Sequence, residues 1–356
     1  MSNEIKLNER TIGDNSPIYF ISDIGANHDG SLERAFNLIE LSKAAGADAA
    51  KFQNFQASKI VSKYGFENLT NSSHQSNWKK SVYEVYEDAS ISLDWTYRLK
   101  EKCDEVGIDY FTSPYDIDSV EHIDKFVELY KIGSGDITWI DFIEYIAKKN
   151  KPILIATGAS NSDDVDRAVK SILKFSDQIC LMQCNTNYTI DKDKHKYVNL
   201  NVLKTYKKQY PSLVLGLSDH TVGNTTVLGA IALGARVIEK HFTDDNNREG
   251  PDHKFSINPK NWKEMVYQAN IMDESLGDGI KRIERNESNS IIVQRRGLRA
   301  NKNLKKGDII KKTDIVALRP IPTDGIPPFK MNEIIGLELK KDLEVDDYFI
   351  WKHFKK

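Results

Sequence analysis

Short apolar runs alternate with longer helical segments along most of the chain. The runs are rich in β-branched and aromatic residues, and the segments between them, such as LERAFNLIELSKAAG and DDVDRAVKSILKF, have apolar residues three and four positions apart. Short buried strands in strict alternation with helices are typical of a parallel sheet covered by helices. The pattern predicts eight strands: Tyr19–Ile24, Ala49–Phe55, Asp109–Ser113, Leu129–Ile132, Ile153–Thr157, Ile179–Gln183, Leu213–Leu217 and Val237–His241.

Eight strand–helix units over about 270 residues fit an α/β fold of the closed (β/α)8 type, a TIM barrel, better than an open doubly wound sheet. Near residue 280 the pattern changes to a polar stretch and then to short strands joined by charged turns. We therefore expect a barrel over residues 1–280, a linker over 281–294 and a small β-rich domain over 295–356.

Residues 56–92 are too long for a simple connection between a strand and its helix. Loops of this length in a compact domain usually serve as lids or partner contacts. The aromatic residues of the segment suit either stacking on a sugar or a buried interface: Tyr64, Phe66, Trp78, Tyr83 and Tyr86.

Composition excludes several classes of function. The chain has 356 residues, 29% of them charged, and a net charge of −2, so no overall basic field favours nucleic acid or an anionic membrane. No apolar run reaches the roughly 18 residues that span a bilayer, and the first residues lack a signal-peptide pattern. Cys103, Cys180 and Cys184 have no CxxC spacing and predict buried, reduced thiols in a cytoplasmic protein.

Histidines follow the last two predicted strands. GLSDHT contains Ser218 and His220, and IEKHFTD contains His241. Active sites of such barrels lie at the carboxyl ends of the strands, and neighbouring strands are about 4.8 Å apart. Either histidine alone suits a structural role, but the two together predict a site for one divalent ion.

Two lysines occupy other predicted strand ends. Lys51 lies in KFQNF, and Lys131 lies in KIGSGD beside Ser134 and two glycines. Ammonium groups near free backbone amides suit a phosphate or a carboxylate. A lysine with a lowered pKa could instead form a Schiff base, and this alternative stays open.

The first predicted strand ends in SDIGANHDG. Asp23 could serve as a general acid or base, or bind a sugar hydroxyl. The HDGS residues that follow favour a turn and a helix cap.

Taken in order, these segments resemble the sialic acid synthase family. The resemblance runs through IGANHDGS, KFQ, TSPY, YKIGSGD, TGAS, GLSDHT, GARVIEKHFTDDNNREGPDH and RRGLRA, and KKGDIIKKTDI with ALRP is similar to the antifreeze-like (SAF) domain of these enzymes. It implies condensation of phosphoenolpyruvate with the open-chain aldehyde of an N-acyl amino sugar, such as N-acetylmannosamine. It also implies a domain-swapped homodimer.

The resemblance further implies roles for single residues. Asp23, His220 and His241 match catalytic positions, and the two histidines match ligands of a divalent metal, with Mn²⁺ expected and Mg²⁺ or Co²⁺ open. Phosphoenolpyruvate would be bound by Lys51, Lys131, Ser134, Thr186 and Ser218. The acceptor would be bound by Gln53, Thr112, Asp136, Tyr188, Asp252 and, from the small domain of the partner, Arg319.

Four positions depart from the family pattern. Asp23 and Asp136 stand where the family often has glutamate, Gln183 where histidine is usual, and Ala156 where some members have serine. The departures leave the acceptor open, including di-N-acetylated 6-deoxy sugars and 6-phosphorylated sugars. A Schiff-base aldolase and a non-catalytic sugar-binding protein are the alternatives from other classes.

Overall fold

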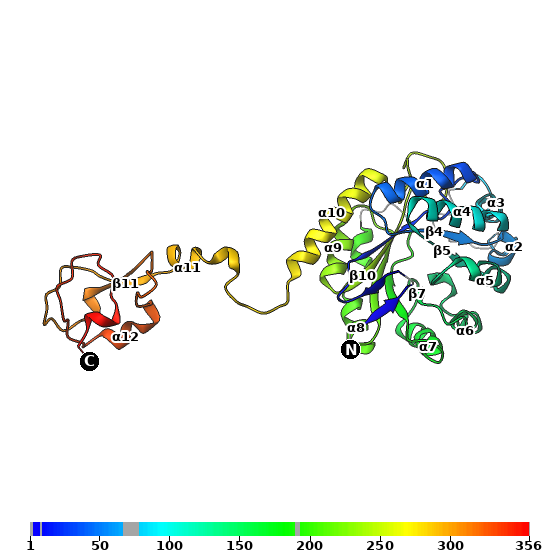
Figure 1. The fold of residues 1–356 in the computed structure, drawn as a ribbon. Helices are drawn as coiled ribbons and strands as arrows, with labels where there is room; N and C mark the ends of the chain where they lie inside the picture. The colour runs from blue at the N-terminus through cyan, green and yellow to red at the C-terminus, as the bar shows by residue number, and fades with distance from the viewer. Residues whose placement is uncertain (1–2, 8, 67–77, 189–192, 356) are drawn as a thin grey trace. The chain divides into compact units, whose positions relative to one another are not determined.

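The computed structural model describes residues 3–7, 9–66, 78–188 and 193–355. The chain divides into two compact units, Met1–Gly277 and Asp278–Lys356 (Figure 1). The first unit ends at residue 277, whereas the sequence pattern predicts that the barrel domain ends at residue 280.

The first unit is built on eight parallel strands in the order β5-β4-β3-β10-β9-β8-β7-β6. Strands β5 and β6 are the two ends of this order, so the barrel is nearly closed, and the predicted TIM-type fold is confirmed. The strands are β3 (Tyr19–Asp23), β4 (Ala49–Asn54), β5 (Asp109–Pro114), β6 (Tyr130–Ile132), β7 (Ile153–Ala156), β8 (Ile179–Cys184), β9 (Val214–Asp219) and β10 (Ala235–His241).

Helices surround the strands (Figure 1). The Ser31 side chain caps α1 by accepting a hydrogen bond from the Arg34 amide, as the HDGS motif predicts. The helices are α1 (Leu32–Ala44), α2 (Ala57–Ile60), α3 (Val82–Ala89), α4 (Leu93–Val106), α5 (Ile117–Ile123), α6 (Ile140–Ala147), α7 (Ser162–Leu173), α8 (Val202–Gln209), α9 (Thr225–Ala232) and α10 (Pro259–Leu276).

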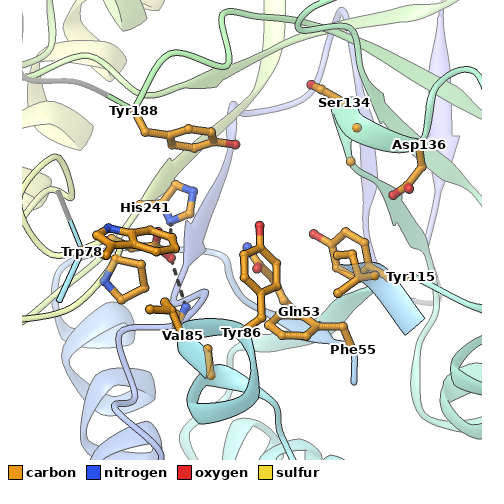
Figure 2. Close-up of a pocket in the computed structure, with 17 residues that line it drawn as sticks. Gln53, Phe55, Trp78, Val85, Tyr86, Tyr115, Ser134, Asp136, Tyr188 and His241 are labelled. Carbon is orange, nitrogen blue, oxygen red and sulfur yellow. Dashed lines mark hydrogen bonds and ion pairs between the residues drawn. The ribbon is translucent and has the colours of Figure 1, made fainter. Parts of the chain in front are cut away.

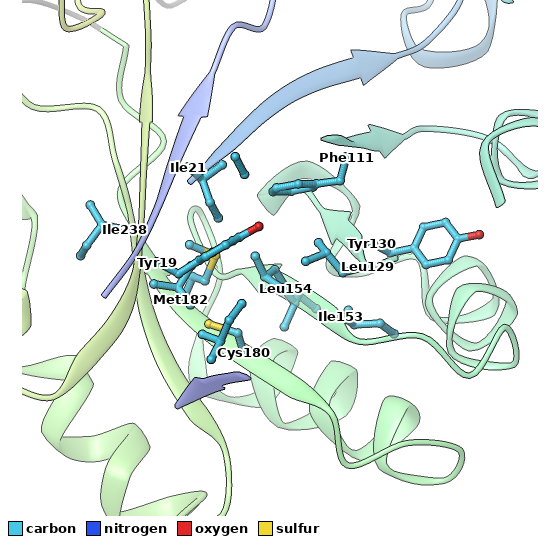
Figure 3. Packing of buried hydrophobic residues seen from close by; sticks show 14 of the residues in the cluster. Tyr19, Ile21, Phe111, Leu129, Tyr130, Ile153, Leu154, Cys180, Met182 and Ile238 are labelled. Carbon is cyan, nitrogen blue, oxygen red and sulfur yellow. The ribbon is translucent and has the colours of Figure 1, made fainter. Parts of the chain in front are cut away.

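Apolar side chains of the strands form one continuous core (Figure 3). Tyr19, Phe111, Leu154 and Met182, from β3, β5, β7 and β8, are all 2% exposed or less. Burying one large apolar side chain stabilises the fold by about 1.5–3 kcal/mol, so this cluster holds the strand ends in fixed positions. The three cysteines are buried and unpaired, as predicted.

A short hairpin precedes the barrel, and the sequence pattern did not predict it. Strands β1 (Glu4–Lys6) and β2 (Thr11–Gly13) pair antiparallel, and each buries one isoleucine. The Asn3 side chain donates to the Pro211 carbonyl at 2.7 Å, just before β9. The hairpin therefore lies at the amino ends of the strands, where barrels carry stability rather than catalysis.

The second unit has a core of its own. Strands β11 (Gly297–Ala300) and β12 (Ile315–Leu318) pair antiparallel, and α12 (Met331–Ile334) follows them. The expected linker over 281–294 is mostly exposed, but it contains α11 (Ser290–Val293). Within the described ranges of either unit, no helix is both long and apolar enough to cross a membrane.

Candidate active site

Strand alternation sorts the residues of β9 and β10 into two sets. Glu239 pairs in register with Ser218, and Lys240 with Asp219, so each pair shares one face of the sheet. The Ser218 hydroxyl donates to the Glu239 carboxylate at 3.1 Å. Lys240 and Asp219 form a separate buried ion pair at 2.5 Å. In the GLSDHT and IEKHFTD motifs, Ser218 and Glu239 therefore face the site. Asp219 and Lys240 face the other way and hold the two strands together.

His220 and His241 lie together, as the sequence predicts. Their ring centroids are 5.4 Å apart, and Tyr188 packs edge-on against His220 at 4.6 Å. The Nδ1 atom of His220 lies 2.9 Å from the Asn185 carbonyl oxygen, which requires a proton on Nδ1 and leaves the Nε2 lone pair for another partner. Burial, assisted by His241, lowers the pKa of His220 to about 3, so the imidazole is neutral.

His241 lies between two carboxylates. Its Nε2 atom is 3.5 Å from Asp23 and its Nδ1 atom 3.6 Å from Asp252, and Nδ1 is buried without a hydrogen-bond partner. The described residues contain no group of three or more His, Cys, Asp or Glu side chains arranged around a metal. One nitrogen from each of the two imidazole rings would fit a divalent ion whose remaining positions are taken by water or substrate.

Four buried charges form the floor of the site. Lys51 lies 2.6 Å from Asp23 and 3.8 Å from Glu239, while Lys131 lies 3.5 Å from Glu239. Burial lowers the pKa of Lys51, but Asp23 and Glu239 together raise it above its ordinary value. Burial conversely raises the pKa of Asp23, but Lys51 and His241 bring it below the ordinary value. The raised pKa favours the ammonium form of Lys51 over the neutral amine that a Schiff base requires, and the lowered pKa favours the carboxylate form of Asp23.

Three loops meet beside this floor. The Gly158 amide donates to the Ser134 hydroxyl at 2.9 Å. A Cβ atom on Gly158 would lie 2.5 Å from the Thr186 side chain and 2.9 Å from Ser134, so only glycine fits there. The KIGSGD, TGAS and QCNTNY segments are thus brought together, and their hydroxyl groups and amides suit a small anion.

A cavity of about 360 Å³ opens beside His241 (Figure 2). Its polar lining includes six residues expected at the site: Gln53, Ser134, Asp136, Tyr188, His241 and Asp252. The long segment after β4 contributes a wall through Ile60, Trp78, Val85, Tyr86 and Ala89. Two of its five aromatic residues, Trp78 and Tyr86, therefore line the cavity, whereas Tyr64 is 63% exposed.

Asp136 has an unusual environment within this lining. Its Oδ2 atom is buried without a hydrogen-bond partner. Burial raises the pKa of Asp136 to about 6, although Lys131 acts in the opposite direction. A carboxyl group with such a pKa can give and take a proton near neutral pH.

Thr112 does not face the cavity, so the expectation that it contacts an acceptor is wrong. Its hydroxyl donates to the Asn54 side chain at 2.8 Å, and Asn54 in turn donates to Thr96 on α4. Side chains alternate along a strand, and the neighbouring Ser113 pairs in register with Gln53 and shares its face. The inward residue of the TSPY segment is therefore Ser113.

Arg319 is exposed in the second unit, and its role stays a prediction. The Gln183 side chain donates to the Val198 carbonyl at 2.9 Å, and Ala156 is buried in β7. Both departures from the family pattern are thus accommodated within the fold.

Two functional candidates were missed in the sequence. Glu239 lies in the IEKHFTD segment, but only the alternation of β10 shows that it faces the lysines. Lys194 is buried, donates to the His220 carbonyl at 2.7 Å and lies 5.9 Å from the Phe255 ring. Nothing in the local sequence around Lys194 signals this contact.

Known proteins of similar sequence and structure identify the family. The NeuB family model matches residues 38–281, and the SAF domain model matches residues 295–355. The chain is 34% identical to an uncharacterised protein of Methanocaldococcus jannaschii, with 98% of each chain covered. It is 32% identical to the N,N'-diacetyllegionaminic acid synthase of Legionella pneumophila, with 96% of each covered. The crystal structure of the N-acetylneuraminic acid (sialic acid) synthetase of Leptospira borgpetersenii matches with a TM-score of 0.71 and 28% identity, over 82% of this chain and 96% of that one. The chain therefore belongs to the NeuB family of sialic-acid-type synthases and carries a SAF domain after its barrel.

Proposed function

We propose that the protein condenses phosphoenolpyruvate with the open-chain aldehyde of an N-acyl amino sugar, N-acetylmannosamine or a related sugar. The products are a 2-keto-3-deoxy sugar acid with three more carbons than the acceptor, and inorganic phosphate released by C–O cleavage. One observation carries the proposal: His220 and His241 lie together beside two buried lysines at the carboxyl ends of the barrel strands.

Phosphoenolpyruvate would lie at the floor and the adjoining loops. Lys51 and Lys131 supply positive charge, and Ser134, Thr186 and Ser218 supply hydroxyl groups. Oriented binding of this kind turns an encounter of two molecules into a reaction between fixed neighbours. The floor charges of Lys51, Lys131, Asp23 and Glu239 sum to zero, so a multiply charged anion requires further positive charge nearby.

A divalent cation, Mn²⁺ in our proposal, would meet this need at His220 and His241. The free Nε2 lone pair of His220 and the unpartnered Nδ1 atom of His241 fit such an ion. When bound, the ion would supply Lewis-acid polarisation of the aldehyde oxygen. Tyr188 and Phe255 pack against both imidazole rings and hold them in place.

Proton transfer would fall to Asp136. The sugar aldehyde oxygen gains a proton in the reaction, and the water that attacks C2 of phosphoenolpyruvate loses one. Asp136 lines the cavity and has a pKa of about 6, whereas Asp23 is held as a carboxylate by Lys51. We therefore assign proton exchange to Asp136 and orientation of water or substrate to Asp23.

The decisive test is phosphate release from phosphoenolpyruvate with Mn²⁺ across a panel of aldehyde-capable sugars. We expect release that requires an acceptor, stops with chelator and returns with excess metal. His220→Ala and His241→Ala should each abolish Mn²⁺ binding in calorimetry. Acceptor-dependent release that persists in chelator would refute the metal assignment. Covalent trapping by borohydride would instead favour a Schiff-base aldolase, and binding of sugars without phosphate release would favour a non-catalytic protein.

We also propose a cytoplasmic, domain-swapped homodimer in which Arg319 reaches the acceptor in the partner's barrel. The exposure of Arg319 in its own unit is compatible with this role. Mixing and refolding the inactive variants Arg319→Ala and His241→Ala should restore activity, because mixed dimers would contain one intact site. No recovery, with mixed dimers demonstrated by mass, would contradict the swap.

A further inference from the structure

The short 3-10 helix η4 (Lys194–Tyr197) lies against the end of β8. The Asn185 side chain donates to the Tyr197 carbonyl at 3.1 Å, and the Gln183 side chain donates to the Val198 carbonyl at 2.9 Å. One donor belongs to the end of β8 and the other directly follows the strand. The backbone of η4 is therefore fixed to the barrel at this end of the strand.

Lys194, the first residue of η4, is buried and holds the backbone of His220. Its exposed fraction is 4%, and its Nζ atom donates to the His220 carbonyl at 2.7 Å. Strand β9 ends at Asp219, so this carbonyl lies in the turn beyond the strand, where a buried acceptor needs another donor. Lys240 donates in the same way to the next carbonyl, that of Thr221, at 2.7 Å. Two buried lysines therefore hold successive carbonyls of the turn that carries the His220 imidazole.

The His220 ring has contacts of its own. Its Nδ1 atom donates to the Asn185 carbonyl at 2.9 Å, and the Phe255 ring packs against it with a centroid distance of 6.1 Å. The Nζ atom of Lys194 lies 5.9 Å from the centre of the Phe255 ring, within the range of a cation–π interaction. Burying a lysine costs free energy, so an apolar side chain would suit this place better if it only filled space. Lys194 instead contacts both the backbone of His220 and an aromatic ring that borders it.

We infer that Lys194 is a positioning residue for metal binding, because it fixes the turn that presents His220 to the ion. The inference rests on the proposed function and adds a residue to its metal site. Lys194 would act through His220 and not by contact with the ion or a substrate. Groups that orient a metal ligand raise its affinity, because the ligand loses less freedom when the metal binds. Asn185 sets the position of the proton on the imidazole, and Lys194 sets the position of the backbone from which the ring extends.

The test is the affinity of the full-length protein for Mn²⁺, measured by calorimetry without phosphoenolpyruvate or acceptor. Lys194→Met removes the donor and the charge at similar side-chain length, and we expect Mn²⁺ to bind about 10–100-fold more weakly. Lys196→Met is the matched control from the same helix, because the Lys196 side chain is 68% exposed and pairs with Asp193 at 2.8 Å. This control should bind Mn²⁺ as tightly as the parent.

Thermal unfolding of each variant separates positioning from stability. Unchanged Mn²⁺ affinity in Lys194→Met would overturn the inference, and a lower Tm beside it would make Lys194 a structural residue. If Lys194→Met does not fold, Lys194→Gln takes its place, because its polar side chain is neutral and one bond shorter than lysine. Affinity equal to the parent's in that variant would overturn the inference equally. A parent that binds no Mn²⁺ would also refute the metal assignment of the proposed function, so the two failures are distinguishable.

Discussion

Asp219 and Lys240 form a buried ion pair inside the GLSDHT and IEKHFTD motifs. Neither residue is assigned to binding or catalysis, so substituting them tests how these motifs stabilise the fold. Both side chains are 2% exposed, and their charged atoms are 2.5 Å apart. Asp219 also accepts hydrogen bonds from the Thr221 amide and hydroxyl at 3.0 Å and from the Thr226 hydroxyl at 2.7 Å. Lys240 has one other partner, the Thr221 carbonyl at 2.7 Å. The lysine therefore depends on the aspartate more than the aspartate depends on the lysine.

Removing one member of a buried pair costs about 3–5 kcal/mol, because the other charge is left uncompensated. We expect Asp219→Asn to fall in this range, which corresponds to a decrease in Tm of roughly 6–20 °C for a domain of this size. Lys240→Met should cost less, because Asp219 keeps three hydrogen bonds. The double variant should lose less stability than the two single losses added together. The difference, which is the coupling energy of the pair, should be about 0.5–3 kcal/mol.

The assay is urea unfolding followed by tryptophan fluorescence, with thermal unfolding beside it. Asp104→Asn on α4 is the matched control, since its pair with Lys100 is largely exposed and should change stability by less than about 1 kcal/mol. If Asp219→Asn cost no more than this control, or if the single losses simply added, the structural role of the pair would be refuted.

The same pair predicts a pH dependence with a definite sign. Burial raises the pKa of Asp219, but Lys240 and the hydrogen bonds bring it below its ordinary value of 3.8 in the folded state. Its contribution to stability is therefore complete above pH 3.8 and is lost as the pH falls through the lower folded-state pKa. Acid unfolding of Lys240→Met should begin at a higher pH than that of the parent, and an unchanged midpoint would contradict the assignment.

Three further predictions address the site. Gly25→Ala should raise the acceptor KM and cost about 1–2 kcal/mol of stability, because φ is +49° and the new Cβ would lie 2.9 Å from Asp252. Gly30→Ala is the control, because its φ is +71° but the nearest atom to the new Cβ is 3.6 Å away. It should lose stability through backbone strain and leave the acceptor KM unchanged. Thr112→Val should lose about 1 kcal/mol in urea unfolding with the acceptor KM unchanged, and a raised KM would restore its role in binding. The kcat/KM profile should decrease as the pH rises through about 6, where Asp136 loses its proton, and Asp136→Asn should remove this step; a step that survives the substitution belongs to another group.

The positions predicted most reliably are those set by local pattern. The strands from Tyr19 to His241 were found because each is a short apolar run between helices with regular apolar spacing. The β1–β2 hairpin was missed, because strands of three residues carry too little pattern to be recognised. Thr112 was placed in the site, but its neighbour Ser113 is the residue that shares the face of Gln53. An error of one position along a strand exchanges its two faces, and the sequence pattern does not fix that position.

The sequence by itself determined the alternation of strands and helices, the order of the motifs and hence the family, because these depend on neighbours along the chain. Only the tertiary structure decided which charged residues face each other and how far water is excluded from them. Glu239 lies 3.5 Å from Lys131, and Asp136 has a pKa of about 6, through contacts and burial supplied by strands and loops distant in the sequence. Electrostatic energies depend on separation and burial in space, so a linear pattern does not specify them.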